Sequence, residues 1–276
     1  MRFRLSGFGD EISDELSVQL RVMSELGVDA LEPRRVQLPG GNTKNIVEMS
    51  DAELQVMRRM LDDHGMACSQ IGSPVGKAPL DSDLEVQVQQ LEGAVRAAHI
   101  LDADYIRVFG FQPVQGDPLP ADRPAALGKF QRLAEHLVSL GPGLTLSLEN
   151  EHDLYDDTPV ACSEFLALGG APISMCFDPG NFVRAGVSPF DDAWPVLGAA
   201  TQMIHVKDYD TSIADWAPAG AGDGQLADVL GSADPKAVAY LSLEPHLAGT
   251  AAGRGRDRAE LWREAHAALM RVLNSQ

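Results

Sequence analysis

One local pattern recurs along the whole sequence: a short apolar run, then a longer amphipathic stretch, then a turn. In the first amphipathic stretch the apolar residues recur every three or four positions, which is the spacing of a helix with one buried face. Parallel strands need a long crossover connection, so a regular strand–helix alternation predicts a parallel sheet with right-handed crossovers. The apolar residues of that first stretch are Leu16, Leu20, Met23 and Leu26, and Gly27 ends it.

The pattern repeats eight times in 276 residues. This fits a closed barrel better than an open doubly wound sheet, because such a barrel takes about 250 residues. We therefore predict a single-domain α/β protein over residues 1–276, a (β/α)8 TIM barrel. Strands are expected at Arg2–Phe8, Val28–Glu32, Met66–Ile71, Tyr105–Phe109, Leu144–Leu148, Ile173–Phe177, Met203–Val206 and Ala237–Leu243. Helices are expected at Ile12–Leu26, Asp51–His64, Ser82–Leu101, Pro124–Leu140, Thr158–Leu168, Pro189–Ala199, Leu226–Leu230 and Asp257–Leu273.

The charge balance excludes one class of partner. The chain has 22 Lys and Arg against 40 Asp and Glu, a net charge of −18. Affinity for nucleic acid is carried mainly by lysine and arginine on phosphates, so a nucleic-acid binder is not expected. An anionic membrane surface is disfavoured for the same reason. The usual phosphate-binding loops, GxGxxG after the first strand and GxxxxGK[ST], do not occur.

Cysteine usage and hydropathy predict a cytoplasmic protein. The three cysteines, Cys68, Cys162 and Cys176, are too scattered for a disulfide framework, and we expect them to be buried in a reducing compartment. No apolar run reaches the roughly 18 residues of a membrane span. The N-terminal segment becomes acidic too early, at Asp10 and Glu11, for a signal peptide.

Polar side chains follow the last four predicted strands at their carboxyl ends, where the active sites of such barrels lie. Each end carries one residue of a metal-ligating type, and the separations of 29, 27 and 39 residues are about one strand–helix unit each. The four side chains can therefore converge on one point. Three carboxylates and one imidazole suit one divalent ion such as Mn²⁺, Mg²⁺, Co²⁺ or Zn²⁺. The four candidates are Glu149, Asp178, His205 and Glu244.

Each of the four also has an ordinary structural explanation. A glutamate at a strand end is often a helix cap or a salt-bridge partner. Asp178, before Pro179, can start a turn, and His205, between apolar residues, can be a hydrogen-bonded core histidine. The occurrence of all four at matching positions of consecutive strands favours the metal site.

Several short segments around these candidates carry a family resemblance. The chain resembles the sugar phosphate isomerase/epimerase superfamily, the xylose isomerase-like TIM barrels that include ketose 3-epimerases and inosose dehydratases. The resemblance covers the whole chain in order and is specific for the superfamily, but not for a substrate. The matching segments are Ser147–Asn150, Asp178–Asn181, His205–Asp208, Gly220–Gly224 and Leu243–Glu244.

The resemblance implies a metal-dependent isomerase or epimerase that acts on a sugar or keto-sugar. It makes Glu149, Asp178, His205 and Glu244 the ligands of one divalent ion, with Glu149 and Glu244 also exchanging the proton. A metal bound to the carbonyl and hydroxyl oxygens would spread the charge of an enediolate. If a hydroxyl leaves from the neighbouring carbon, the same groups give dehydration, as in an inosose dehydratase-like lyase.

Two positions depart from the epimerase pattern. Epimerases usually have a histidine three residues after the aspartate, where this chain has Asn181, and an arginine shortly after the His-x-Lys-Asp segment, where it has Tyr209–Thr211. Both changes concern substrate contacts. The DNA-repair endonuclease branch of the fold matches poorly, because it needs further histidines and aspartates for three zinc ions and a basic DNA-binding face.

Further residues near the predicted strand ends are candidates for contacts with a sugar-like substrate. Arg34, next to Arg35, is expected to be a solvated surface charge, and Asp208 could orient His205 or pair with Lys207. The Gly220–Gly224 run favours a close-approach turn over a mobile loop. The substrate-binding candidates are Asn181, Lys207, His246, Arg107 and Glu32, with His152 as a weaker one; Phe8, Phe109 and Trp216 could wall the sugar, although core packing is the default for aromatic residues.

The sequence leaves a second class of function open, a non-catalytic barrel that binds a sugar-like molecule. The expected partner in either case is a small molecule, with no nucleic acid and no membrane. Members of the superfamily are often oligomeric, so a homo-oligomer is compatible with the sequence, although no segment identifies an interface.

Overall fold

Eight parallel strands form the inner ring of the protein in the computed structural model, which describes residues 2–140 and 143–275. The two ends of the predicted domain, residues 1 and 276, lie outside the described part. The strands of the ring are β1 (Leu5–Gly7), β2 (Ala30–Leu31), β5 (Ala67–Cys68), β6 (Tyr105–Val108), β7 (Thr145–Glu149), β8 (Ile173–Phe177), β9 (Thr201–Val206) and β12 (Tyr240–Leu243).

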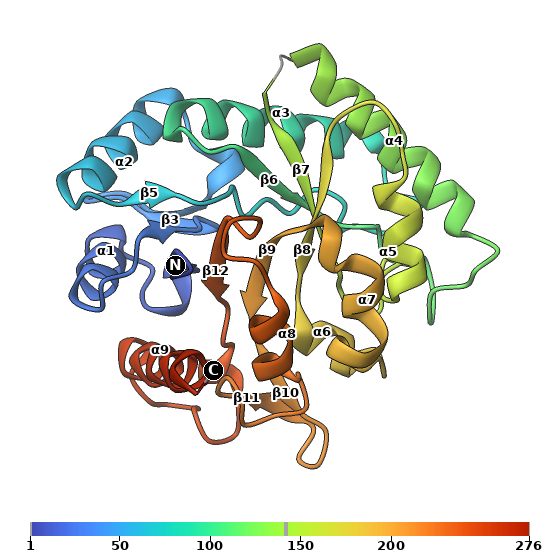
Figure 1. Cartoon of the computed structure of the whole chain (residues 1–276). Coiled ribbons are helices and arrows are strands. Elements are labelled where there is room, and N and C mark those ends of the chain that lie inside the picture. The colour runs from blue at the N-terminus through green and yellow to red at the C-terminus, as the bar shows by residue number, and fades with distance from the viewer. Residues whose placement is uncertain (1, 141–142, 276) are drawn as a thin grey trace.

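Hydrogen bonding closes this ring. Six strands form one parallel sheet in the order β1-β12-β9-β8-β7-β6, and β2 pairs in parallel with β5. Single parallel bridges, Phe8 with Glu32 and Ile71 with Ile106, join the pair to the sheet on both sides. The first and last strands are therefore neighbours, as the blue and red segments of Figure 1 show. The predicted (β/α)8 barrel is confirmed.

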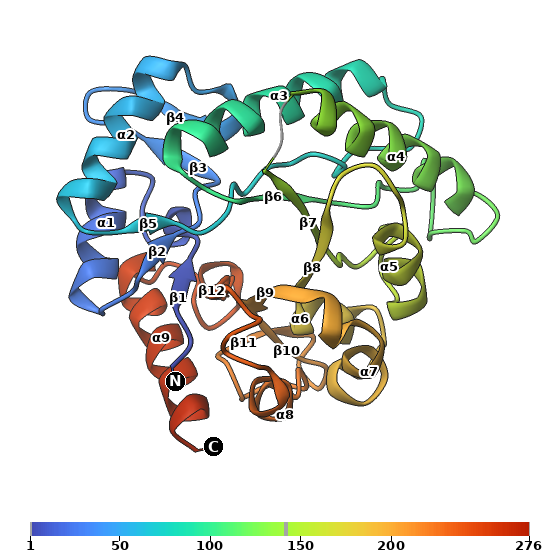
Figure 2. The ribbon, with the colours of Figure 1, turned by 45° about the horizontal axis from the view of Figure 1, so that its top comes forward.

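Helices surround the ring on the outside (Figure 2). Their buried faces supply one continuous apolar core with the strands, including Leu16, Leu91, Phe130 and Trp262. The helices are α1 (Leu16–Glu25), α2 (Asp51–Asp63), α3 (Leu84–Leu101), α4 (Arg123–Leu140), α5 (Pro159–Leu166), α6 (Pro179–Arg184), α7 (Trp194–Leu197), α8 (Leu226–Ser232) and α9 (Arg258–Asn274). Short 3-10 turns lie at Gly9–Glu11, Ile46–Glu48, Gly198–Ala200 and Leu247–Gly249, and a π-helical turn at Pro189–Ala193.

The sequence pattern placed these elements in the right order but not at their exact ends. The strand expected at Arg2–Phe8 is shorter in the structure, where β1 spans Leu5–Gly7. The prediction was too long because an apolar pattern does not show where strand pairing begins. The helix expected at Pro189–Ala199 is divided into a π-helical turn, α7 and a 3-10 turn. Pro195 lies in the first turn of α7, where its missing N–H costs no helical hydrogen bond. The short helix α6 was not predicted.

Two hairpins extend beyond the carboxyl ends of ring strands. One, β3 (Arg35–Gln37) with β4 (Thr43–Asn45), follows β2. The other, β10 (Asp208–Asp210) with β11 (Asp215–Ala217), follows β9 and was not predicted. The second hairpin carries Trp216.

The three cysteines are free and buried, as predicted.

Candidate metal centre

Four side chains meet at the carboxyl ends of neighbouring strands. Glu149 is the last residue of β7, Asp178 follows β8, His205 lies in β9 and Glu244 follows β12. One ligand atom from each of the four lies within 4.8 Å of the other three. The structure thus brings together all four predicted metal ligands, which are separated by 27 to 39 residues in the sequence.

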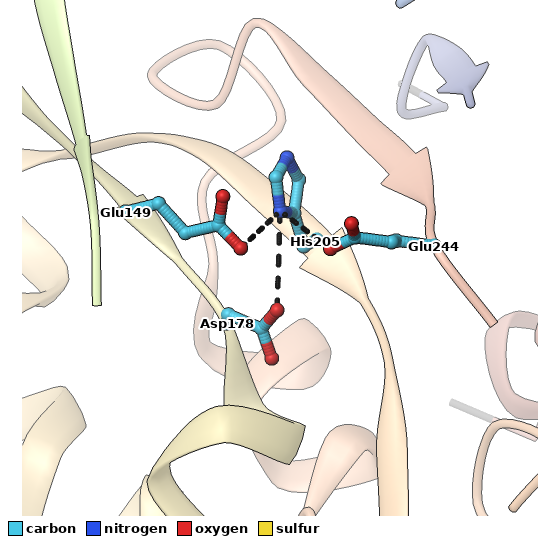
Figure 3. A group of neighbouring side chains, drawn as sticks. All are labelled: Glu149, Asp178, His205 and Glu244. Atoms are coloured by element: carbon cyan, nitrogen blue, oxygen red, sulfur yellow. Dashed lines mark ion pairs between the residues drawn. The ribbon is translucent and has the colours of Figure 1, made fainter. Parts of the chain in front are cut away.

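Three carboxylates face one nitrogen of the imidazole. His205 Nδ1 lies 3.2 Å from Glu149 Oε1, 3.3 Å from Glu244 Oε2 and 3.9 Å from Asp178 Oδ2. Figure 3 shows Glu149 and Glu244 on opposite sides of the ring nitrogen, with Asp178 on a third side. All four residues are at most 2% exposed.

The donor set fits a divalent ion. His205 Nδ1 is buried and has no hydrogen-bond partner within the described part of the chain. Atoms that each lie about 2.1 Å from one cation are roughly 3.0–3.5 Å apart at tetrahedral or octahedral angles. Two of the three distances to Nδ1 lie in that range, and the third is only slightly longer. These four residues could therefore hold a metal ion.

Burial and neighbouring cations set the charge of the carboxylates. Burial raises the pKa of Asp178 to about 7, against the opposing effect of Lys207. Burial also acts to raise the pKa of Glu244, but Lys207 and His246 hold it well below its usual range. Closely spaced carboxylates disfavour ionising together. A bound cation would remove this conflict.

Glu32 lies behind the imidazole rather than among its metal-facing partners. Its Oε2 atom is 3.3 Å from His205 Nε2. Gln70 Nε2 donates to Glu32 Oε1 over 2.8 Å, and Ser242 Oγ donates to Glu32 Oε2 over 2.5 Å. Gln70 Nε2 also lies 3.3 Å from His205 Nε2. In the tautomer with its proton on Nε2, close to Glu32, His205 would present the lone pair of Nδ1 to the cluster. Nothing in the sequence singled out Gln70 or Ser242, because both lie within or beside apolar strands.

Two of the substrate-binding candidates are cations that pair with carboxylates of the cluster. Lys207 Nζ donates to Asp178 Oδ2 over 2.9 Å and to Glu244 Oε2 over 3.1 Å. Arg107 Nη1 donates to Glu149 Oε2 over 3.1 Å. Both cations are buried. Their charges offset part of the repulsion among the carboxylates, and both lie within reach of a molecule bound at the cluster.

The other candidates lie on opposite flanks of the cluster. Asn181 Nδ2 donates to Glu149 Oε1 over 3.4 Å, and its Oδ1 lies 3.2 Å from His152 Nδ1. His246 is partly exposed, with its Nε2 3.7 Å from Glu244 Oε1 and its Nδ1 2.8 Å from Glu11 Oε1. The histidines therefore lie at the entrance, while Asn181 is part of the buried floor.

The prediction for Arg34 was wrong. Its side chain is only 24% exposed, and Nη1 donates to Glu244 Oε1 over 2.9 Å. The residue follows β2, so its side chain reaches inward across the end of the barrel. Its neighbour Arg35 is the exposed one of the two. The sequence did not show which of the two adjacent arginines faces the solvent.

Asp208 binds the glycine loop rather than His205 or Lys207, the two partners that the sequence suggested for it. Its carboxylate accepts backbone N–H groups from the loop, 2.8 Å from Gly220, 3.0 Å from Gly222 and 2.8 Å from Gly224. A Cβ atom at Gly222 would lie 2.5 Å from Asp208 Oδ1. The glycine run is thus a close-approach turn, as predicted. It folds the chain back over Asp208, beside the hairpin that carries Trp216.

Of the three predicted aromatic walls, only Trp216 is partly exposed. Its ring centroid lies 5.3 Å from that of His246 and 6.5 Å from that of His152, and Lys207 Nζ lies 5.1 Å from it. Phe8 and Phe109 are buried, so they pack in the core, as is the default expectation for aromatic residues.

Two cavities open beside the histidines His246 and His152. One, of about 360 Å³, is lined by Trp216 and His246 together with Asp10, Glu11 and Arg258 among others. The other, of about 330 Å³, is lined in part by Lys77, Gln112, Glu151 and His152.

Lys77 was missed by the sequence reasoning. It pairs with Glu151, and its Nζ lies 4.9 Å from the ring of Phe109. The available signal was the Ser-Pro-Val-Gly-Lys turn at 73–77, directly after the third predicted strand.

Comparison with known proteins identifies the family. Residues 20–272 match the sequence model of the Xylose isomerase-like TIM barrel family. The chain therefore belongs to that family. No curated protein matches the chain. Among residues 2–140 and 143–275, no helix combines the length and apolar character needed to cross a membrane.

Solved structures share the fold at low sequence identity. IolI protein with a bound zinc atom is 13% identical at a TM-score of 0.72, with 99% of this chain and 98% of that chain covered. A D-tagatose 3-epimerase-like protein is 15% identical at 0.69, with 100% and 99% covered. The probable 3-DHS dehydratase AsbF from Bacillus anthracis is 16% identical at 0.67, with 98% and 99% covered. At these identities the likeness extends to the fold alone.

Proposed function

We propose that the protein is a divalent-metal-dependent isomerase or epimerase that moves a proton on a sugar or keto-sugar through an enediolate. One observation carries the proposal: His205 Nδ1 is buried, has no hydrogen-bond partner among residues 2–140 and 143–275, and is faced by three carboxylates. A buried polar atom without a partner costs about 1–3 kcal/mol. A metal ion at this point would satisfy it.

The charges around the cluster support a divalent ion. The cluster and the groups that pair with it hold more carboxylates than cations, and a divalent ion would offset this excess of negative charge. The carboxylates are Asp10, Glu11, Glu32, Glu149, Asp178 and Glu244, and the cations are Arg34, Arg107 and Lys207.

Glu149 and Glu244 are proposed as the acid–base pair. They come from opposite sides of the cluster, so a substrate bound between them presents one face to each. Removal of a proton on one side and its return on the other would invert a carbon centre. The metal, when bound, would stabilise negative charge on the substrate oxygens. One carboxylate oxygen of each glutamate, held by Arg107 or Arg34, is turned away from the imidazole.

Other side chains would bind and orient the substrate. Lys207 and Arg107 can donate to its oxygens, and His152 and His246 line the two cavities beside the cluster. Trp216 between these histidines would cover the apolar face of a sugar ring. The free, buried cysteines agree with a cytoplasmic location. The IolI protein, which shares the fold, is reported with a bound zinc atom, and this agrees with the proposal of a metal in this chain.

The test is proton exchange at carbon. Ketoses and inososes are incubated with the Mn²⁺-loaded protein in deuterated water and followed by NMR. Incorporation of deuterium at carbon without loss of water supports the proposal, and dehydration of the substrate would indicate the lyase instead. Binding of a sugar with no exchange would indicate the non-catalytic barrel.

Two variants assign the exchange to the cluster. Glu149→Gln and Glu244→Gln are each expected to lower the exchange rate by about 10²-fold or more, since an acid–base residue contributes 10²–10⁴-fold. Glu164→Gln is the matched control, because Glu164 lies on α5 and pairs with Arg123 on the outside of the barrel. Exchange that persists in both cluster variants would exclude this pair.

A further inference from the structure

The two oxygens of the Glu244 carboxylate have different partners. Oε2 faces the cluster, 3.3 Å from His205 Nδ1 and 3.1 Å from Lys207 Nζ. Oε1 accepts a hydrogen bond from Arg34 Nη1 over 2.9 Å, and its other charged neighbours, Arg107 Nη1 and His246 Nε2, are more distant at 3.8 and 3.7 Å. The residue is 2% exposed, so these contacts are made away from solvent. Arg34 thus holds one specific oxygen of a candidate metal ligand.

Arg34 is itself fixed on two sides. Its Nε and Nη2 atoms donate to the two carboxylate oxygens of Asp10, over 2.9 and 3.2 Å. Its guanidinium lies 4.4 Å from the ring centroid of the buried Phe8. A planar guanidinium that is bound in this two-pronged way and stacked on a ring has little rotational freedom. Nη1 is the donor left over, and it is directed at Glu244.

The backbone fixes the positions of Asp10 and Arg34 relative to each other. Asp10 lies in the 3-10 turn directly after β1, and Arg34 lies just beyond β2. The bridge between Phe8 and Glu32 joins the two segments. Asp10 and Arg34 are therefore tied to adjacent ring strands, and Glu244 follows β12 on the other side of β1.

We propose that Arg34, anchored by Asp10, is a positioning residue that holds Glu244 Oε1 away from the cluster and so presents Oε2 alone as a metal ligand. The inference rests on the metal site of the proposed function. A carboxylate that is free to rotate can bind a cation through either oxygen or both. A carboxylate fixed in this way offers one oxygen in one direction and needs no rearrangement when the metal binds.

The same contact explains why a second group of ligand-type residues beside the cluster needs no ion. Glu11, Glu244 and His246 also bring ligand atoms within 4.8 Å of one another. Arg34 already supplies positive charge there, with Nη2 3.8 Å from Glu11 Oε1. We therefore expect one metal ion per chain.

Calorimetric titration of the metal-free protein with Mn²⁺ tests the positioning role. Arg34→Lys keeps the charge but cannot bind both Asp10 oxygens and Glu244 at once. We expect its dissociation constant for Mn²⁺ to rise about 10-fold or more, the usual effect of losing a residue that orients a ligand. Arg263→Lys is the matched control, because Arg263 lies on α9 and pairs with Glu25 on the outer surface, away from the cluster. Unchanged Mn²⁺ affinity in Arg34→Lys would overturn the proposal.

Two further measurements separate positioning from charge and from general stability. If Arg34 acted only through its charge, Arg34→Met would bind Mn²⁺ more tightly than the wild type, and that result would overturn the proposal. In Arg34→Ala, added methylguanidinium should restore Mn²⁺ affinity, because it can take the place of the missing guanidinium. If Arg34 had only a structural role, no such rescue would occur. Absence of rescue in the folded variant counts against positioning.

A double-mutant cycle with Asp10→Asn keeps the test independent of any one variant. Because Asp10 and Arg34 act as one unit, Asp10→Asn combined with Arg34→Lys should weaken Mn²⁺ binding no more than Arg34→Lys alone. Additive losses would overturn the anchoring role of Asp10. Failure of the wild-type protein to bind Mn²⁺ would instead reject the metal site of the proposed function, before any variant is compared.

Discussion

Glu32 Oε2 lies 3.3 Å from His205 Nε2, on the side of the imidazole opposite the nitrogen that faces Glu149. Both residues are fully buried. The strand-end position of Glu32 predicted a substrate contact, but this geometry favours an action through His205. A carboxylate behind a ligating histidine fixes its tautomer and raises its basicity.

Glu32→Gln should therefore weaken metal binding without contacting the metal. We expect the dissociation constant for Mn²⁺ to rise by about 10- to 100-fold, because the amide no longer favours a proton on Nε2. Calorimetric titration measures the effect, with Glu85→Gln in the first turn of α3 as the control. Equal Mn²⁺ affinities in the two variants would show that Glu32 does not orient His205.

Divalent metal should stabilise the folded protein. A ligand that binds only the native state, at 100 times its dissociation constant, raises the free energy of unfolding by about 2.7 kcal/mol. Thermal unfolding with Mn²⁺ and with EDTA measures the difference. Asp178→Asn should abolish the Mn²⁺ shift while retaining the α6 cap, because asparagine can also accept the N–H of Asn181. A midpoint that is identical with Mn²⁺ and with EDTA would contradict the metal site.

Gly76 is required by a close backbone contact in the turn that carries Lys77. Its φ is +83°, and a Cβ atom there would lie 2.0 Å from the carbonyl oxygen of Phe109. Gly76→Ala should lower the free energy of unfolding by about 3 kcal/mol or more. Gly116 has φ +65° with nothing within 4 Å of such a Cβ, so Gly116→Ala should cost only about 1–2 kcal/mol. Urea unfolding compares the two, and equal losses would refute the contact argument.

The buried carboxyl of Asp156 should make stability depend on pH. Burial raises its pKa well above the usual value, and Oδ2 accepts the Gly110 N–H over 2.8 Å. The native state keeps a proton that the unfolded chain releases above about pH 4. This group's contribution is therefore complete at low pH and falls as pH rises towards the raised pKa, by at most about 1.4 kcal/mol per pH unit.

Asp156→Asn isolates this contribution, because other titrating groups are common to both proteins. The free energy of unfolding of the wild type, relative to the variant, should decrease between pH 5 and pH 8 in urea titrations. A constant difference across that interval would mean that Asp156 is ionised in the folded protein.

The sequence by itself determined the barrel and the four residues of the cluster. The strand–helix alternation is local, since each repeat shows its own hydrophobic period. Glu149, Asp178, His205 and Glu244 could be grouped because the carboxyl ends of consecutive parallel strands lie on one side of the ring. Exact strand ends and the hairpin carrying Trp216 were not predictable, because pairing partners rather than patterning set them.

Only the tertiary structure decided what surrounds the cluster. Arg34 and Glu244 are 210 positions apart in the sequence. Arg34 turns inward because the Glu244 carboxylate lies there, and the sequence alone does not show that the two residues meet. The inward position of Glu32, the contacts of Gln70 and the glycine loop bound by Asp208 depend on the same kind of long-range contact. A strand end shows which residues reach the mouth of the barrel, and packing between distant segments determines which atoms they meet.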